Sequence, residues 1–394
     1  MKADARTIPG GWVALAAPHR LGGSTHLDIL RSWTLAAGIV GLCGTVIFGA
    51  SAAKVLLVAM LSAIATDCIV GYARARPVVG GLSHASLTGL LLGLTLPATV
   101  PWYIPAIGSL IAVVFGKIVF GGLGHFCWQP ALVGRVVLQL LFLPTLSLSL
   151  NPTWPILAPG HLLVGRLDHP QRVVMAGYGG WLAQPHDANV HALAMERPVQ
   201  TLRAFAQGRF RPDDGLAYEP LLREKLPPWQ DTIFGLVPGG IGETCTLALI
   251  IAGLYLIYRG FLRWQMPVVM IAAAAVAAAL LPVESGGNEG GYDWFPVFAV
   301  EQGRAVGVAY VLYHLTSGEL MLGAFLIAGD MTTTPMRARG QALFAAGVGV
   351  LTIFMRLYGV VECECYWSIL AMNSLVGVID GRLRRRVLGM DEEP

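Results

Sequence analysis

Long apolar runs alternate with short polar segments along most of the chain. The runs last about fifteen to twenty residues, a length that suits a helix across the hydrocarbon core of a bilayer. The predicted spans are 31–50, 53–72, 84–98, 102–120, 129–149, 241–258, 266–283, 305–329, 340–358 and 366–380. The pattern therefore predicts an all-α polytopic membrane protein of about ten transmembrane helices.

A long polar segment, residues 151–240, separates the fifth and sixth predicted spans and has no apolar run long enough to cross a bilayer. It divides the chain into a first group of spans, 31–150, and a second group, 241–380. Residues 1–30 form an N-terminal segment, and residues 381–394 form a basic and then acidic tail. The N-terminal segment lacks the pattern of a cleaved signal peptide, so we expect the first helix to be retained.

Composition and charge support this picture and predict the orientation. Of all residues, 55% are hydrophobic and 13% charged, about half the charged share of an ordinary soluble domain. There is no basic block, so nucleic acid binding is not expected. Basic residues gather on one side of the predicted spans: Lys2, Arg6, Arg20, Arg31, Arg74, Arg76, Arg259, Arg263, Arg337, Arg339, Arg382, Arg384, Arg385 and Arg386. This bias predicts cytoplasmic termini, and residues 151–240 outside, in a bacterial inner membrane.

Two segments, one in each group of spans, align without gaps. His84-Ala-Ser-Leu-Thr-Gly-Leu-Leu-Leu-Gly93 matches His314-Leu-Thr-Ser-Gly-Glu-Leu-Met-Leu-Gly323, and an interrupted stretch with a proline follows each. Two halves with an odd number of spans are inverted relative to each other, and broken helices in such repeats point to a midplane site. Inversion would also place His84 and His314 on opposite faces, so we expect no site shared by them. Chance similarity between apolar stretches is the alternative.

Four stretches carry a resemblance to a known family. They are Gly116-Lys-Ile-Val-Phe-Gly-Gly-Leu-Gly-His125 with Gln129-Pro-Ala-Leu-Val-Gly-Arg135; Pro238-Gly-Gly-Ile-Gly-Glu-Thr244; His314-Leu-Thr-Ser-Gly-Glu-Leu-Met-Leu-Gly-Ala324 with Asp330-Met-Thr-Thr-Thr-Pro335; and Arg356-Leu-Tyr-Gly359 with Asn373. In this order and spacing they resemble the RnfD/NqrB family, over roughly residues 60–380.

The resemblance implies a fold of two inverted five-helix repeats, similar to urea transporters. It implies a membrane subunit of an Rnf-type complex that couples electron transfer between ferredoxin, NADH or a quinone to translocation of Na⁺ or H⁺. Its partners would be other Rnf- or Nqr-type membrane subunits and flavin or iron–sulfur subunits. The chain would be part of a translocase, not a self-sufficient enzyme, so no catalytic residue is assigned. The alternatives are a stand-alone channel or transporter for a small polar solute, and a flavin-free scaffold subunit.

The resemblance also implies a flavin, either FMN or riboflavin. Family members carry FMN on a threonine in the outside loop after the fifth helix. The equivalent stretch here, Asp187-Ala-Asn-Val-His-Ala-Leu-Ala-Met-Glu-Arg-Pro198, has no Ser or Thr, and the nearest hydroxyl is that of Thr201. Because a phosphoester bond needs a hydroxyl, we predict that a flavin in this subunit is held non-covalently, with Thr201 as the fallback anchor.

Candidate site residues lie in glycine-rich turns and beside hydroxyls. The predicted cofactor-binding residues are Gly121, Gly122, Gly124, Gly240, Gly242, Glu243, Thr244, Thr332 and Thr334. Glycine lets a ring or phosphate approach the backbone, although such turns also suit tight helix packing. Glu243 and Asp330 are the predicted ion path, because ionisable groups at membrane depth are costly and usually functional. Helix capping is the alternative for Glu243, and a surface ion pair with Arg337 or Arg339 is the alternative for Asp330.

The turn before the last predicted span, Glu362-Cys-Glu-Cys-Tyr-Trp367, departs from the family pattern. Its two cysteines are too few for a closed zinc or iron–sulfur site, which normally has four ligands. We therefore predict no metal site. The six cysteines are scattered and do not indicate a disulfide framework.

Overall fold

The computed structural model describes residues 6–8, 12–14, 26–74, 79–122, 124–147, 197–208, 218, 221–222, 226–227, 229–284, 292–299, 304–359 and 361–382. Most of the predicted N-terminal segment and outside loop, and nearly all of the tail, therefore lie outside the described residues. The same holds for residues 187–196, where the family places its covalent flavin.

Helices occupy all the ranges that the apolar pattern predicts to span the bilayer. They are α1 (His26–Phe48), α2 (Ala50–Ala73), α3 (Val79–Leu94), α4 (Tyr103–Val113) with the π-helix η1 (Val114–Ile118), α5 (Pro130–Leu141) with α6 (Leu143–Ser147), α11 (Thr246–Tyr258), α12 (Gln265–Leu280), α14 (Arg304–Thr316), α15 (Leu320–Leu322) with η4 (Gly323–Ile327), α16 (Ala338–Tyr358) and α17 (Glu364–Arg382). Within the described ranges, α1, α2 and α16 are long and apolar enough to cross a membrane. The helices on either side of the α14–α15 break pass the same test together, with a bend of 60°. Shorter apolar helices are α3, α4, α5, α11 and α12.

Smaller elements complete the described chain. The short helices are α8 (Pro198–Ala206), α10 (Trp229–Phe234) and α13 (Pro296–Ala299). Two antiparallel hairpins pair β1 (Arg6–Ile8) with β2 (Trp12–Ala14) and β3 (Val283–Glu284) with β4 (Tyr292–Asp293). The all-α prediction missed these hairpins, because strands of two or three residues are too short to show a periodic pattern.

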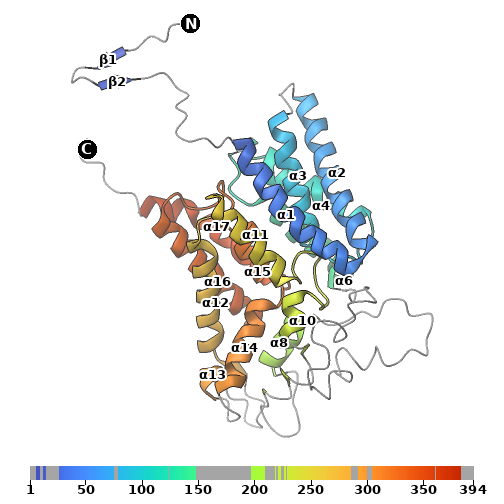
Figure 1. Ribbon diagram of the computed structural model, residues 1–394, viewed down its shortest axis with the longest axis vertical. Coiled ribbons are helices and arrows are strands. Elements are labelled where there is room, and N and C mark those ends of the chain that lie inside the picture. Colours follow the sequence, from blue (N-terminus) through green and yellow to red (C-terminus); the bar gives the residue numbers. More distant parts are fainter. Residues whose placement is uncertain are drawn as a thin grey trace.

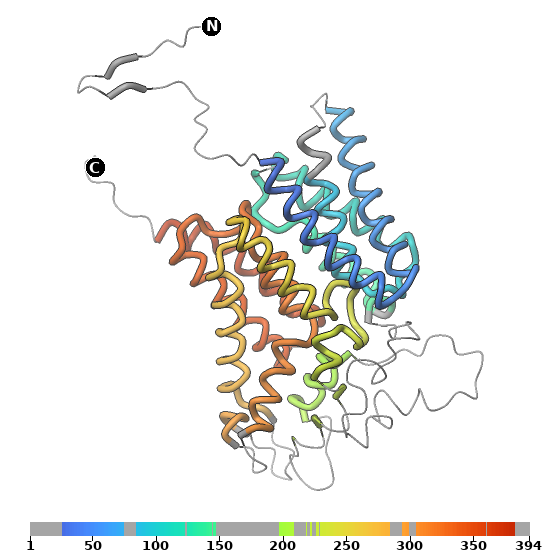
Figure 2. Tube along the Cα trace, viewed as in Figure 1, coloured from blue at the N-terminus to red at the C-terminus, as the bar shows by residue number. Residues whose placement is uncertain are grey.

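The helices form two groups (Figure 1). Helices α1 to α4 lie together, and α12, α14, α16 and α17 form the second group, with α11 beside α1 (Figure 2). α5 packs against α4 of the first group and also against α17 of the second. α1 of the first group packs against α11, which begins the second half of the chain, so the two groups share an interface. Large apolar side chains are also exposed, among them Leu57, Leu61 and Ile69 of α2. An outward apolar surface of this kind suits a lipid environment.

The two segments that align in sequence differ in structure. Residues 84–93 lie inside the continuous helix α3. Residues 314–323 are interrupted between Thr316 and Leu320, where the span bends. Gly318 in this break has φ +76°, a conformation that glycine adopts at little cost.

Unwound backbone from the two groups meets between them. At and just beyond the end of α3, the carbonyls of Leu94 and Leu96 accept hydrogen bonds from the N–H groups of Gly242 and Ile241, at 2.8 and 2.9 Å. A Cβ on Gly242 would lie 2.8 Å from the Cβ of Leu94, so the close approach requires glycine. In a bilayer, non-helical backbone is tolerated where protein groups satisfy it in this way.

Candidate functional site

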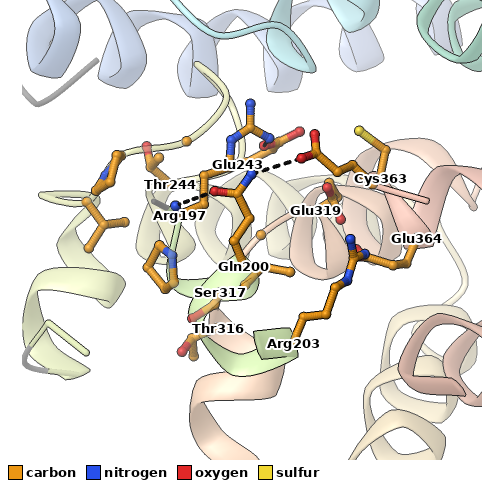
Figure 3. Close-up of a pocket in the computed structure, with 17 residues that line it drawn as sticks. Arg197, Gln200, Arg203, Glu243, Thr244, Thr316, Ser317, Glu319, Cys363 and Glu364 are labelled. Carbon is orange, nitrogen blue, oxygen red and sulfur yellow. Dashed lines mark hydrogen bonds and ion pairs between the residues drawn. The ribbon is translucent and has the colours of Figure 1, made fainter. Parts of the chain in front are cut away.

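A largely buried set of charged side chains lies beside this unwound contact. Figure 3 labels Arg197, Arg203, Glu243, Glu319 and Glu364 from this set. The set draws on α5, α8, the stretch before α11, the α14–α15 break, α16 and the start of α17. We define the central charge cluster as Arg135, Arg197, Arg203, Arg356, Glu243, Glu319, Glu362 and Glu364. The four arginines balance the four glutamates, which lowers the cost of burying so many charges.

Glu243 is held by three different elements. Its Oε2 accepts a hydrogen bond from the N–H of Gly240 at 3.0 Å, and its Oε1 accepts one from the Tyr366 hydroxyl at 2.5 Å. The guanidinium of Arg197 lies 4.0 Å away. α11 begins only at Thr246 and is preceded by Cys245 as its N-cap. Glu243 therefore does not cap the helix, and the capping alternative is wrong.

Arg197 is positioned by the start of α8. Pro198 occupies the first helical position, and the side chain of Gln200 accepts a hydrogen bond from the Arg197 N–H at 3.0 Å, two features that favour a helix start. The guanidinium donates to the carbonyl of Leu146 at 2.8 Å. Burial by itself lowers the pKa of Arg197, but the surrounding carboxylates, Glu243 foremost, outweigh it, and the pKa is raised. Arg197 therefore stays a cation.

The turn before α17 pairs with α8. Arg203 donates to the Glu364 carboxylate and, at 2.7 Å, to the carbonyl of Val361. Glu362 accepts from the side-chain amides of Gln200 at 2.9 Å and Gln139 at 3.1 Å. The turn at residues 362–367 departs from the family pattern, as does the stretch that ends at the start of α8. In the structure, these two unusual segments are joined by the hydrogen bonds of Glu362 and Glu364 to residues of α8.

Arg135 and Arg356 each satisfy carbonyls that a helix end leaves free. Both side chains are fully buried. Arg135 donates to the carbonyl of Thr95, just after α3, at 3.1 Å. Arg356 donates to the carbonyls of His314 at 2.5 Å and Ser317 at 3.4 Å, at the end of α14. The two guanidinium groups thus stabilise the two places where helices stop inside the protein.

A small cavity lies within the cluster and has a volume of about 20 Å³, roughly the space for one water molecule. Four glutamates but only two arginines of the cluster line it. Glu319, 3% exposed, contributes Oε2, which has no hydrogen-bond partner among the described residues. Three further lining oxygens are equally without a partner there: Thr244 Oγ1, Ser317 Oγ and Glu364 Oε2.

Asp330 lies apart from this cluster, in a second cavity of about 90 Å³ whose lining includes His26, Trp33, His84 and Thr332. Among the described residues, Asp330 makes no ion pair, so the predicted alternative of a pair with a nearby arginine is not seen. Its Oδ1 instead accepts from the N–H of Thr332 at 3.2 Å and from the Thr332 hydroxyl at 3.0 Å. Partial burial raises the pKa of Asp330, and these two hydrogen bonds oppose the rise.

Thr334 and the glycine turn have local roles. The Thr334 hydroxyl donates to the carbonyl of Asp330 at 2.9 Å. Gly121, Gly122 and Gly124 have φ values of +109°, +104° and +85°, so the turn itself requires glycine. None of these four residues lines either cavity. The predicted cofactor-binding residues are therefore not brought together at one site.

Neither of these two cavities fits a flavin. The two cavities, about 20 and 90 Å³, are far below the roughly 300 Å³ of a pocket for a ligand of that size. Gly240 and Gly242 are used in the contact between the two groups, and the hydroxyl of Thr201 is buried, 3.5 Å from the carbonyl of Arg197. Within the described ranges, no group of three or more His, Cys, Asp or Glu could hold a metal ion.

Of the eight residues in the central charge cluster, only Glu243 is among the site residues predicted from the sequence. For Glu319 a signal was available, because it is an acid inside the predicted span 305–329, and such residues are functional hypotheses by default. No comparable signal marks Arg197 and Arg203, which lie in a polar segment where arginines are unremarkable. Cys363 enters the site through its sulfur, 2.9 Å from Arg135, not through a metal.

Comparison with known proteins gives consistent matches over almost the whole chain. Residues 13–389 match the NQR2, RnfD, RnfE family. The D subunit of an ion-translocating oxidoreductase complex from Halorhodospira halophila is 31% identical over 95% of each chain. The D subunit of a proton-translocating ferredoxin:NAD(+) oxidoreductase complex from Clostridium ljungdahlii is 32% identical, over 93% of this chain and 92% of that one. A Na(+)-translocating counterpart from Acetobacterium woodii is 28% identical, over 87% and 85%.

Proposed function

Because the chain belongs to the NQR2, RnfD, RnfE family, we propose that it is the D subunit of an Rnf-type complex. It is a membrane-integral subunit of a multi-subunit oxidoreductase. The complex would couple electron transfer between ferredoxin, NADH or a quinone to translocation of Na⁺ or H⁺. Its partners would be Rnf- or Nqr-type membrane subunits and flavin or iron–sulfur subunits. The relatives' names include one proton-translocating and one Na⁺-translocating complex, so the ion is left to experiment.

The proposal includes ten spans in two inverted halves, similar to urea transporters, with cytoplasmic termini in a bacterial inner membrane. Its support is the helix in each predicted range and the bent span at α14–α15. A reporter that is active only in the cytoplasm, fused near residue 190, should be inactive. An active fusion would show that the helix count of the first half is wrong by one.

The observation that carries an ion path is the central charge cluster itself. Ionisable residues at membrane depth are costly and mark ion or proton pathways. Glu243 lies next to the unwound contact between the two groups, and broken backbone at the midplane is where transporters bind coupling ions. Asp330 would serve the same path from its separate cavity.

Redox-driven ion uptake in membrane vesicles tests this function. In the assembled complex, Glu243→Gln and Asp330→Asn should slow electron transfer, uptake, or both, while the amount of complex stays normal. Asp380→Asn is the control, because Asp380 lies at the other end of α17 from the cluster and an amide oxygen at this position can still accept from the Met336 N–H. Normal uptake in both variants would remove these carboxylates from the ion path. Loss of the complex would instead assign them a structural role.

We also propose that a flavin in this subunit, FMN or riboflavin, would be bound non-covalently and outside the two cavities. The absence of a hydroxyl in residues 187–198 and the burial of Thr201 support this. The absorbance spectrum of the purified protein, before and after acid precipitation, tests it. Yellow colour should leave with the supernatant. In-gel fluorescence that survives SDS would show a covalent bond, and Thr201→Ala would then be the variant to make.

A further inference from the structure

Glu319 is the one carboxylate of the cavity lining whose Oε2 lacks a partner and which makes no ion pair among the described residues. Glu243 has Tyr366 and Arg197, and Glu362 has two amides. Glu364 has Arg203 on one oxygen only. An ionised carboxylate buried without a donor is strongly unfavourable. A positive species must therefore accompany Glu319 in at least one state of the protein.

Arg356 makes no ion pair with Glu319 among the described residues, and its Nε is buried there without a partner. Its Nη1 and Nη2 donate to the carbonyls of His314 and Ser317. Four glutamates and two arginines line the cavity, whereas the other two arginines of the cluster, Arg135 and Arg356, do not. The charge at the cavity wall is therefore negative and attracts a cation. The volume of about 20 Å³ admits one particle of the size of a water molecule.

We infer that Glu319 is the carboxylate that takes up and releases one monovalent cation, either a proton or a Na⁺ ion small enough for the cavity. Glu364, Ser317 and Thr244 line the same cavity, and each has a side-chain oxygen without a partner among the described residues. All four are carboxylate or hydroxyl oxygens, the ligand type that hard cations prefer. Glu319 binds the cation in one state and releases it in the other. This exchange changes no oxidation state, so it needs no electron donor or acceptor at Glu319.

The position of Glu319 suits such an exchange. It lies in the break of a bent span, and broken helices hold the coupling ion in many transporters. Charged groups from every neighbouring element act on it: Glu243, Glu364, Arg135, Arg197 and Arg356, together with the titratable Cys363, Cys365 and Tyr366. The gapless repeat places Gly89 at the same position in the first half, so the exchange would belong to the second half alone.

Labelling of the wild-type protein tests the binding without any substitution. Dicyclohexylcarbodiimide reacts with protonated carboxyls in apolar surroundings, and mass spectrometry locates the adduct. We expect an adduct on Glu319 that declines as the pH rises. Protection by Na⁺, but not by choline at equal ionic strength, identifies Na⁺ as the cation. Labelling that Na⁺ leaves unchanged identifies a proton. No adduct on Glu319 at any pH, together with no Na⁺-specific rise in melting temperature, would overturn the inference.

Ion uptake tests whether Glu319 takes part in translocation, a role that rests on the proposed function. In the assembled complex, Glu319→Gln should lower ion uptake by roughly tenfold or more, whereas Asp380→Asn should leave it unchanged. Glu319→Asp should recover part of the uptake, because it restores the carboxylate. Normal uptake by Glu319→Gln would refute this inference while the proposed function stands. A wild-type complex that transports no ion would refute the proposed function, whatever the labelling shows.

Discussion

The two halves of the chain share a sequence pattern, but the aligned polar residues differ in their hydrogen-bond partners. In the first half, His84 is partnered, since the Thr88 hydroxyl lies 3.3 Å from its Nδ1 and donates to its carbonyl at 2.9 Å. In the second half the position of Thr88 is taken by Gly318. Both ring nitrogens of His314 are buried and have no partner among the described residues.

The same contrast continues one residue later. Gly89 lies where a Cβ would be 2.5 Å from the carbonyl oxygen of Ala59, so this position in the first half serves close packing. Its counterpart, Glu319, brings a carboxylate into a small cavity. The first half therefore uses this position for close packing, whereas the second half uses it to place an ionisable group in a cavity.

Loss of Arg356 should have the largest effect on stability. Arg356→Leu would leave the carbonyls of His314 and Ser317 without their donor and would remove one of the four arginines of the central charge cluster. We expect a loss of roughly 3–5 kcal/mol of unfolding free energy, visible as a large drop in melting temperature or in yield of folded protein. Arg31→Leu, on the exposed face of α1, is the matched control and should change stability by no more than about 0.5 kcal/mol. Equal losses of stability in the two variants would show that Arg356 does not stabilise the break between α14 and α15.

A side chain at Gly318 should have the next largest effect. Gly318→Ala would place a Cβ 2.5 Å from Cγ2 of Val199 at a φ of +76°, and strain of this kind costs roughly 1–3 kcal/mol. Gly377→Ala is the control, because a Cβ there meets nothing within 4 Å, and it should be neutral or slightly stabilising. Thermal unfolding of both purified variants measures the difference. If Gly318→Ala is as stable as the control, the break does not depend on glycine.

Long apolar runs made the helices predictable from the sequence, because a run of bilayer length has few alternatives to a helix. The two hairpins were not predictable from their short strands. The bend between Thr316 and Leu320 was hidden, since residues 314–323 align with a segment that stays helical. Gly318 could have suggested it, but a single glycine also occurs inside membrane helices.

The site was predictable only in part. Glu243 and Thr244 were found because an acid followed a glycine-rich stretch, and they do line the central cavity. The cluster as a whole was not foreseeable, because it joins residues far apart in the sequence, such as Arg203 with Glu364 and Arg135 with Cys363. Partner choice among distant charges depends on how the helices pack, and one sequence does not show this.

The Thr88 hydroxyl has hydrogen-bond partners, whereas the Ser317 hydroxyl has none among the described residues. Thr88→Val removes hydrogen bonds to His84 and should cost about 1 kcal/mol of unfolding free energy. Ser317→Ala removes a hydroxyl without a partner among the described residues, so it should cost less when measured in choline chloride without Na⁺. The melting temperatures of the two variants, each relative to the wild type, measure the difference. A larger loss for Ser317→Ala would mean that its hydroxyl is bound in the native protein, which would weaken the contrast between the halves.

The smallest expected effect concerns Asp330. This residue belongs to the second half and has no counterpart in the first, because residues 94–101 contain no ionisable group. The pKa of Asp330 is raised in the folded protein, so the folded state binds its proton more tightly than the unfolded chain. Stability from this group is therefore present at low pH and is lost as the pH rises through the folded pKa, the window just above about pH 4. Asp330→Asn cannot titrate, and its amide oxygen can still accept from the Thr332 N–H. The melting temperature of the wild type, relative to that of Asp330→Asn, should fall modestly from about pH 4 to neutral pH. A difference that stays constant, or that rises with pH, would show that Asp330 is stabilised as a carboxylate, for example by a cation in its cavity.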